Sequence, residues 1–251
     1  MRYYRYYFFK FITMKQEQIN QIILDSLIKL KNINRKPIDF TKLLQKCNPF
    51  ELVVQCHTTD EVVDFIMDNH IKTSRSTIWG DFLELIAVKI CELSLNGYKS
   101  KEDCTDLEWV DQDKKHYRGF KSSPKWANAD QKKTANNKNK ELREQTDFGS
   151  YKVLTSYGKT AKRTNENNFI QLSGQDAWEE ISNDQDMYKK VMEGIKNNSH
   201  IIGQFLNNIY ISDVDRSVRW FSDNFITDNK INSIKIVEYV SSRDKINVTK
   251  W

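Results

Sequence analysis

Apolar residues recur every three or four positions in several long segments of the chain, a spacing typical of helices that bury one face. This spacing predicts helices over 19–30, over 59–70 and over 77–95, the last ending before an Asn-Gly pair. The apolar face of the third helix is built by Phe82, Leu83, Ile86, Ile90 and Leu93. Glu84 lies inside that apolar run, where a carboxylate is costly unless it is paired or bound to a metal.

The middle of the chain alternates polar and apolar positions as strands do. Strands are predicted over 105–110 and 116–121, joined by a charged turn into a hairpin, and again over 151–157 and 168–172. A polar segment from 128 to about 146 is compatible with a helix. Helices and strands in this order predict an α/β fold.

From residue 174 onward the pattern is mainly helical. The late segment 234–240, IKIVEYV, fits either a strand or a helix. No repeat and no clear domain boundary is visible. We therefore expect residues 14–251 to form one domain, with its core at about 76–182 and a helical part at about 183–251.

The first thirteen residues, MRYYRYYFFKFIT, hold seven aromatic side chains and allow two interpretations. They are an aromatic N-terminal arm, or the start is misassigned and Met14 is the first residue. We favour the second, because a clean helical pattern begins directly after Met14. The apolar runs between Arg5 and Lys10 are too short to span a bilayer, so no membrane partner is expected.

Composition adds mainly exclusions. The four cysteines and four histidines show neither a disulfide framework nor zinc-ligand spacing, which predicts reduced, mostly buried thiols in a cytoplasmic protein. Three prolines and eight glycines exclude collagen-like or linker-rich chains. The apolar fraction of 39% is enough for a sizeable core.

Basic residues concentrate in one stretch. Residues 114–163 hold fourteen Lys or Arg against four acidic residues, a local charge of +10 in a chain whose net charge is +5. The rest of the chain is therefore about −5. Such segregation fits a surface that binds a polyanion, with interleaved Asn, Gln and Trp able to contact phosphates or bases. A solvated, lysine-rich surface is the alternative.

Acidic residues directly before this stretch give it a chemical context. Side chains alternate along a strand, so Asp106 and Glu108 share one face. Lys121 ends the neighbouring strand, ~4.8 Å away, and Glu84 on the preceding helix can pack against the same face. Carboxylates in such a group hold Mg²⁺, and the lysine orients water and balances charge on a phosphodiester. A surface hairpin with ordinary ion pairs is the alternative interpretation.

Four segments carry a more specific signal: TIWGDFLELIAV, DLEW, YRGFKSSPKWANADQ and LSGQDAWEEIS. They resemble one family of type II restriction endonucleases in the PD-(D/E)xK superfamily. That family has the patterns G-[ND]-F-L-E, D-[IL]-E-[FW], K-S-G-P-N-W-G-N-x-x-Q and G-Q-x-x-W-E-x-I-S. Order and spacing agree over about residues 48–190, most of the chain.

The resemblance implies a PD-(D/E)xK core, a four- or five-stranded mixed sheet flanked by helices, with extra helices at both ends of the chain. It implies Mg²⁺-dependent cleavage of double-stranded DNA by a homodimer, and a cognate DNA methyltransferase in the same system that is not a binding partner. Carried over by position, Asp106 is the metal-binding aspartate, Lys121 the catalytic lysine and Glu84 the helical glutamate that completes the site.

The sequence departs from the family pattern at two places. The acid expected two residues before the lysine is replaced by Gly119, and we expect Glu108 or Glu84 to substitute for it as a catalytic and metal-binding group. In the loop that follows, Ser123 and Ala127 stand where the family has glycines.

Candidates for DNA contacts follow the lysine. They are Lys125, Asn128, Gln131, Lys132 and Lys133, with Arg163 and Asn165 in a later loop. For the homodimer, the helical region 201–226 is the candidate interface, although its Trp220, Phe221 and Phe225 are equally explained as core.

Two other functions fit the same residues. A non-catalytic nucleic-acid-binding module would keep the fold with a degenerate site, and Gly119 favours it. A nuclease of the same superfamily with little sequence preference, acting in repair or on RNA, is the other.

Overall fold

The computed structural model describes residues 14–32, 37–159, 169–208, 210–243 and 245–251. These residues fall into two compact units, each built from two separate stretches of the chain. One unit combines the described residues of 14–32 with those of 79–200, and the other combines the described residues of 37–78 with those of 201–251.

The first unit contains one mixed five-stranded sheet in the order β1-β2-β3-β4-β5. Its strands are β1 (Tyr98–Lys99), β2 (Leu107–Asp111), β3 (Lys114–Lys121), β4 (Phe148–Thr155) and β5 (Ile170–Ser173). The β1–β2 and β2–β3 pairs are antiparallel, whereas the β3–β4 and β4–β5 pairs are parallel. The predicted α/β fold with a mixed sheet is therefore confirmed.

The β2–β3 hairpin has the register that its sequence predicts, with Leu107 opposite Arg118 and Asp111 opposite Lys114. Its two turn residues, Gln112 and Asp113, have φ of +48° and +60°. Two positive φ angles match the twist of a two-residue hairpin turn to that of the strands.

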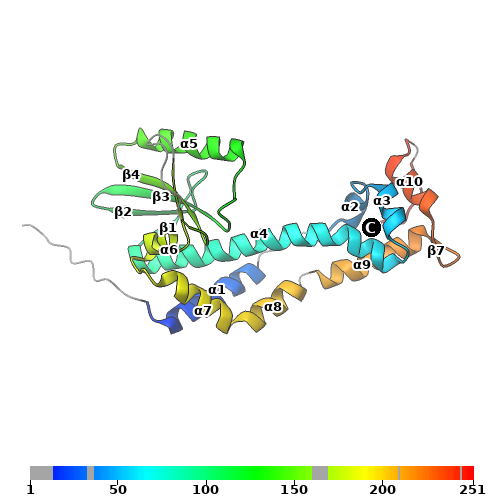
Figure 1. Cartoon of the computed structure of the whole chain (residues 1–251), viewed down its shortest axis with the longest axis horizontal. Coiled ribbons are helices and arrows are strands. Elements are labelled where there is room, and N and C mark those ends of the chain that lie inside the picture. The colour runs from blue at the N-terminus through cyan, green and yellow to red at the C-terminus, as the bar shows by residue number, and fades with distance from the viewer. Residues whose placement is uncertain (1–13, 33–36, 160–168, 209, 244) are drawn as a thin grey trace, which may run out of the picture. The chain divides into compact units, whose positions relative to one another are not determined.

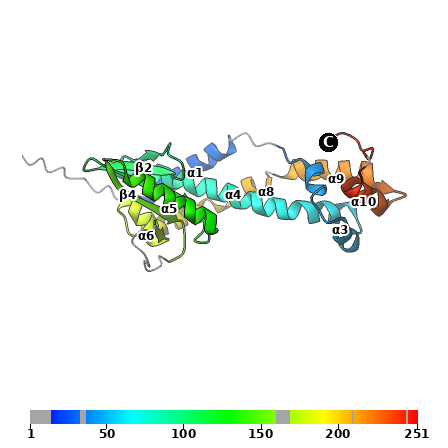
Figure 2. The same cartoon turned by 90° about the horizontal axis from the view of Figure 1, so that it is seen from above.

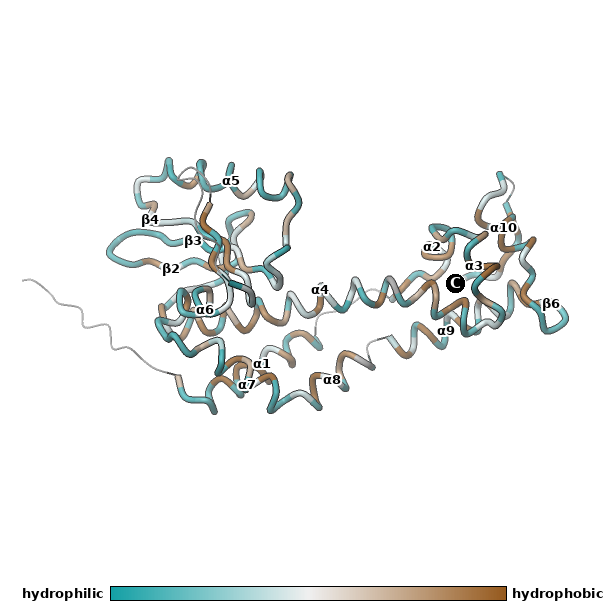
Figure 3. Tube along the Cα trace, in the orientation of Figure 1, coloured by the Kyte–Doolittle hydropathy of each residue, from teal (hydrophilic) through white to brown (hydrophobic). Residues whose placement is uncertain are grey.

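Helix α5 (Ala129–Arg143) connects the parallel strands β3 and β4 and covers one face of the sheet (Figures 1 and 2). It is largely hydrophilic (Figure 3), but Ala135 and Leu142 pack with Tyr117, Tyr151 and Val153 of the sheet. The predicted polar helix from 128 to about 146 is confirmed, and its narrow apolar stripe explains why it was recognised mainly by its polarity.

Helix α6 (Gln175–Ser182) lies on the opposite face of the sheet from α5 (Figure 1). The Trp178 ring packs edge-on against Phe120 of β3, with ring centroids 5.4 Å apart. Because side chains alternate along β3, Phe120 and Arg118 face α6, whereas Tyr117, Gly119 and Lys121 face the α5 side.

Helix α4 (Thr59–Leu95) is one continuous helix of 37 residues. The prediction of separate helices over 59–70 and 77–95 is wrong, because the polar residues between them contain no Gly or Pro that would end a helix. Leu93 was expected in the core but is 45% exposed. Small residues, Ala87 and Cys91, complete the buried stripe instead.

Helices α1 (Gln16–Lys31) and α7 (Met187–Asn197) complete the first unit and pack on each other. Gly194 faces Ile23 so closely that a Cβ at this position would lie 2.4 Å from the isoleucine Cδ1. Side chains also tie the start of α1 to α7, since Lys190 Nζ donates to the Met14 carbonyl at 3.0 Å. The predicted helix over 19–30 is confirmed.

The second unit is built from helices around an aromatic core. It contains α2 (Phe40–Leu44), α3 (Pro49–Gln55), the first part of α4, most of α8 (Ser199–Asn208), α9 (Ile211–Phe225), the β6 (Ile226–Thr227) and β7 (Lys230–Ile231) hairpin, and α10 (Ser233–Ser241). The ambiguous segment 234–240 is helical. Asn232 caps α10 by accepting the Lys235 N–H at 3.0 Å.

The C-terminal aromatic residues belong to this core. Trp220, Phe221 and Phe225 are 5%, 0% and 0% exposed, and Trp220 packs edge-on against Phe40 at 6.0 Å. The core interpretation of these three residues is therefore right, and they are not surface groups of an interface. Within the described ranges, no helix is both long and apolar enough to cross a bilayer.

Candidate active site

Asp106 and Lys121 meet at the ends of adjacent strands. Lys121 Nζ lies 3.0 Å from Asp106 Oδ2, and the same oxygen accepts the Phe120 N–H at 2.6 Å. The Asp106 N–H in turn donates to the Arg118 carbonyl at 2.7 Å. Hydrogen bonds to the main chain of β3 therefore hold Asp106 in place, while 35% of the Lys121 side chain stays open to solvent.

Glu84 lies close to this pair through a second lysine. Lys99 of β1 donates to Glu84 Oε1 at 2.9 Å. The hydrogen bond and charge of Glu84, with the charges of Asp106 and Asp81, raise the pKa of Lys99. Both the helical glutamate and the strand aspartate are therefore within electrostatic reach of one ammonium group.

Gly80 explains how α4 approaches the sheet at this point. A Cβ on Gly80 would lie 3.6 Å from Ser122 Oγ, directly after Lys121. The first residue of the GDFLE segment therefore lies beside the end of β3. This contact brings Glu84, one turn further along α4, to the same end of the sheet.

Glu108 is held in a different environment. It is 9% exposed and accepts the Ser100 hydroxyl at 2.6 Å. A hydrogen bond to Glu108 also raises the pKa of Tyr98. Among the described residues, no hydrogen bond or ion pair joins Glu108 to Asp106 or Lys121. The sequence correctly places Glu108 in the hairpin, but the structure gives its carboxylate two hydroxyl partners instead of the lysine.

The space beside Gly119 is already occupied. A Cβ at this position would lie 3.1 Å from the carbonyl oxygen of Cys104, which also accepts the Tyr151 hydroxyl at 3.3 Å. Cys104 adopts φ of +61° in the loop before β2. This loop takes the room that an acidic side chain would need, which gives a physical reason for glycine here.

The loop and helix after Lys121 present free cations. Lys125, Lys132 and Lys133 are exposed, and none of the described residues forms an ion pair with them. Asn128 and Gln131 instead form the N-terminal capping box of α5, each side chain accepting the other's backbone N–H at 2.9 Å. Arg163 and Asn165 lie outside the described residues.

Part of the basic stretch has a purely structural role. Lys138 is buried in α5 and pairs with Glu102 at 2.9 Å and with Glu141 at 2.8 Å. Arg118 is 1% exposed in β3. The local charge of the sequence therefore overstates the number of cations available to a polyanion.

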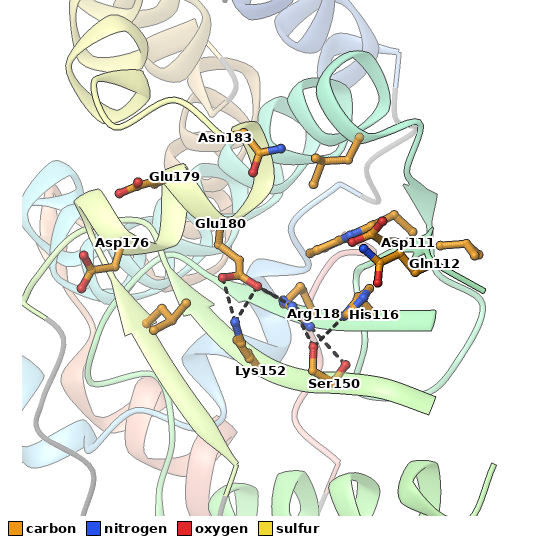
Figure 4. Close-up of a pocket in the computed structure, with 14 residues that line it drawn as sticks. Asp111, Gln112, His116, Arg118, Ser150, Lys152, Asp176, Glu179, Glu180 and Asn183 are labelled. Carbon is orange, nitrogen blue, oxygen red and sulfur yellow. Dashed lines mark hydrogen bonds and ion pairs between the residues drawn. The ribbon is translucent and has the colours of Figure 1, made fainter. Parts of the chain in front are cut away.

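Arg118 belongs to a cavity of about 730 Å³ on the α6 side of the sheet, away from Lys121 (Figure 4). Its guanidinium pairs with Glu180, donates to Ser150 Oγ at 3.0 Å and lies 4.5 Å from the Trp109 ring centroid. Lys152 also pairs with Glu180, at 2.7 Å. Both cations thus share one carboxylate, and this cavity is separate from the Asp106–Lys121 pair.

Two residues at the site were missed in the sequence. Lys99 lies on a strand of two residues, too short to predict from alternation, and the charge of Asp81 acts on this lysine beside that of Glu84. The available signal was their proximity in sequence to recognised motifs. Asp81 lies within GDFLE, and Lys99 follows the Asn-Gly pair that ends α4.

The donor set suits a magnesium ion with few protein ligands. Among the described residues, no group of three or more His, Cys, Asp or Glu side chains is arranged to hold a metal. Mg²⁺, however, is commonly bound through one or two carboxylates together with water and substrate phosphates. Asp106 and Glu84 are carboxylates of this kind, and each is paired with one lysine.

The mixed five-stranded sheet flanked by helices is consistent with a restriction-endonuclease-like core. The family model of type II restriction endonuclease EcoO109I matches residues 2–201. Because this match spans most of the chain, the protein belongs to that family and is a type II site-specific deoxyribonuclease. No curated protein matches the chain.

Proposed function

We propose that the protein hydrolyses both strands of DNA at a specific sequence in a Mg²⁺-dependent reaction centred on Asp106 and Lys121. The observation that carries the proposal is the 3.0 Å contact between these side chains in the fold of a restriction endonuclease family. Lys125, Lys132 and Lys133 supply phosphate contacts beside the site, and Asn128 and Gln131 lie at its DNA-facing helix end. Arg163 remains a candidate for base readout.

Each protein group has a defined part in this mechanism. Asp106 and Glu84 would hold the metal, which when bound makes a water more acidic and neutralises charge on the phosphate. Lys121, fixed by Asp106, orients the attacking water and stabilises negative charge that develops on the phosphodiester. Glu84 supplies the second carboxylate in place of the acid absent at Gly119, whereas Glu108 supports the strand that carries Asp106.

We extend the proposal to a homodimer. The chain contributes one Asp106–Lys121 pair, cleavage of two strands needs two, and identical subunits match a two-fold symmetric DNA site. Light scattering after size-exclusion chromatography is expected to give twice the chain mass of 29.8 kDa. A mass of one chain, both free and on DNA, would contradict this part. The enzyme would act in the cytoplasm, where a cognate methyltransferase protects the host DNA.

The decisive experiment is incubation with a long, fully sequenced, unmethylated DNA in Mg²⁺ or in EDTA. Discrete fragments are expected only with Mg²⁺, and their ends define the recognition sequence. Asp106→Ala and Lys121→Ala are expected to abolish cleavage while binding DNA in EDTA within a few-fold of wild type. Asp111→Ala, at the far end of the same strand, is the matched control and should cleave normally.

The alternatives give different results in the same experiment. Intact DNA with a retained gel shift would identify the non-catalytic binding module that Gly119 favours. A continuous smear would identify a nuclease with little sequence preference. Cleavage by either active-site variant would contradict the assigned site.

A further inference from the structure

Three neighbouring strands place two lysines around one aspartate. Lys99 of β1 is paired in register with Leu107 of β2, the residue after Asp106. Lys121 ends β3 on the other side of β2 and pairs with Asp106. Side chains alternate along a strand, so Lys99 shares the sheet face of Leu107, and the charge of Asp106 on the neighbouring strand position still acts on its ammonium group.

The two lysines hold different carboxylates. Lys121 Nζ lies 3.0 Å from Asp106 Oδ2, and Lys99 Nζ lies 2.9 Å from Glu84 Oε1. The Glu84 side chain is 22% exposed, whereas that of Lys99 is 63% exposed. The glutamate is therefore partly enclosed by the protein, and its lysine partner is free to move into solvent.

We propose that Lys99 is a positioning residue of the active site, which holds the Glu84 carboxylate in the metal-free enzyme and competes with the divalent metal for it. This inference rests on the proposed function. A metal that uses Glu84 must displace the Lys99 ammonium from the same oxygen. Lys99 thereby balances the charge of Glu84 before the metal arrives, and it raises the metal concentration that the enzyme needs.

Charge around Lys99 supports this role. The carboxylates of Glu84, Asp106 and Asp81 all stabilise its ammonium form. Lys101, two residues further on, is also exposed but pairs with none of these carboxylates among the described residues. It therefore offers a matched substitution that removes the same charge from the same short segment.

The test measures Mn²⁺ binding to DNA-free protein from the electron paramagnetic resonance signal of the free ion. Lys99→Met is expected to bind Mn²⁺ about two- to fivefold more tightly, the range that corresponds to a surface ion pair. Lys99→Arg and Lys101→Met should bind as wild type does. In the Glu84→Gln background, Lys99→Met should lose its effect, since the competition requires the carboxylate.

The outcomes separate this inference from the proposed function. If wild type cleaves DNA and binds Mn²⁺ but Lys99→Met binds it no more tightly than Lys101→Met, only the role of Lys99 is overturned. Weaker binding by Lys99→Met also overturns it. A wild-type protein that neither cleaves DNA nor binds Mn²⁺ at this site refutes the proposed function itself. Thermal unfolding of each variant checks that its fold is intact.

Discussion

Glu84 and Glu108 are the two candidates for the second acid beside Asp106. Glu84 is paired with the ammonium group of a lysine, whereas Glu108 accepts a hydrogen bond from a hydroxyl group. Glu84 faces a mobile ammonium that solvent or a metal can replace. Glu108 is enclosed and accepts the hydroxyl of Ser100. If Glu108 moved to bind a metal, it would leave a buried hydroxyl without its acceptor, which costs free energy. The surroundings of the two glutamates therefore favour Glu84 as the second acid.

Substitution of each glutamate should separate catalysis from stability. Glu84→Ala is expected to abolish cleavage with little change in the free energy of unfolding, since exposed ion pairs contribute about 0–1 kcal/mol. Glu108→Ala is expected to retain cleavage but to lose about 1–3 kcal/mol of stability, because Ser100 loses its acceptor. Plasmid cleavage and urea unfolding measure the two effects.

The control for this pair is Glu92→Ala, an exposed residue of α4 that pairs with Lys89. It should change neither cleavage nor stability appreciably. A stable but inactive Glu108→Ala protein would reverse the assignment of the two glutamates.

At the scale of elements, one carboxylate joins α6 to two strands of the sheet, beside the packing of Trp178 on Phe120. Glu180 of α6 pairs with Arg118 of β3 and Lys152 of β4. Burial alone would raise the pKa of Glu180, but the charges and hydrogen bonds of Arg118 and Lys152 outweigh it and lower the pKa. Burial lowers the pKa of Arg118, which makes its carboxylate partner indispensable.

This network predicts a pH-dependent contribution to stability. A folded-state pKa below the ordinary value means that Glu180 stabilises the fold above about pH 4.5, and that this stability is lost as the pH falls through the folded-state pKa. Glu180→Gln is expected to cost about 3–5 kcal/mol near pH 7, because it leaves the buried Arg118 without a carboxylate.

Urea unfolding between pH 7 and pH 3 measures the effect. The difference between wild type and Glu180→Gln should shrink below about pH 4.5. Glu179→Gln, one residue earlier on the exposed side of α6, is the control and should follow wild type. A difference that stays constant with pH would mean that packing, not the ion pairs, links α6 to the sheet.

At the scale of the whole molecule, the basic residues of 114–163 form two groups. One group is buried or paired and stabilises the fold, and the other is exposed to solvent. Arg118 and Lys138 are buried, and Lys121 and Lys152 are paired. The exposed lysines of the loop and α5 remain for DNA. Affinity that depends on such cations falls with salt because each phosphate contact releases counterions.

The salt dependence of DNA binding tests this division. For Lys132→Ala/Lys133→Ala, the slope of log affinity against log salt is expected to decrease in magnitude by about 2, equally for specific and unrelated DNA. Fluorescence anisotropy in EDTA, between about 50 and 200 mM salt, provides the measurement. Lys42→Ala/Lys46→Ala removes two exposed charges from α2 and the turn that follows it, and should leave the slope unchanged. Equal slopes for both double variants would place the DNA elsewhere.

The sequence by itself determined the local elements and the class of chemistry. The β2–β3 hairpin, α5 and the helix over 19–30 follow from alternation, spacing and turn residues, which act between near neighbours. The meeting of Asp106 with Lys121 follows from the hairpin register: Leu107 lies opposite Arg118, so Asp106 lies opposite Gly119, and Lys121 is the next residue of β3 on the same face. The motif residues that indicated a restriction endonuclease are local in the same way.

Only the tertiary structure decided which charged groups are free to act. Lys99 donates a hydrogen bond to Glu84 from a two-residue strand that no sequence pattern predicts. The carboxylate of Glu108 is instead engaged by the hydroxyl of Ser100. The carbonyl oxygen of Cys104 explains why residue 119 is a glycine. Glu180 of α6 provides the counter-charge that allows Arg118 to be buried. Burial and pairing depend on residues far apart in the chain. A charge pattern in the sequence therefore identifies the ionisable residues, and the fold decides which of them meet water, metal or DNA.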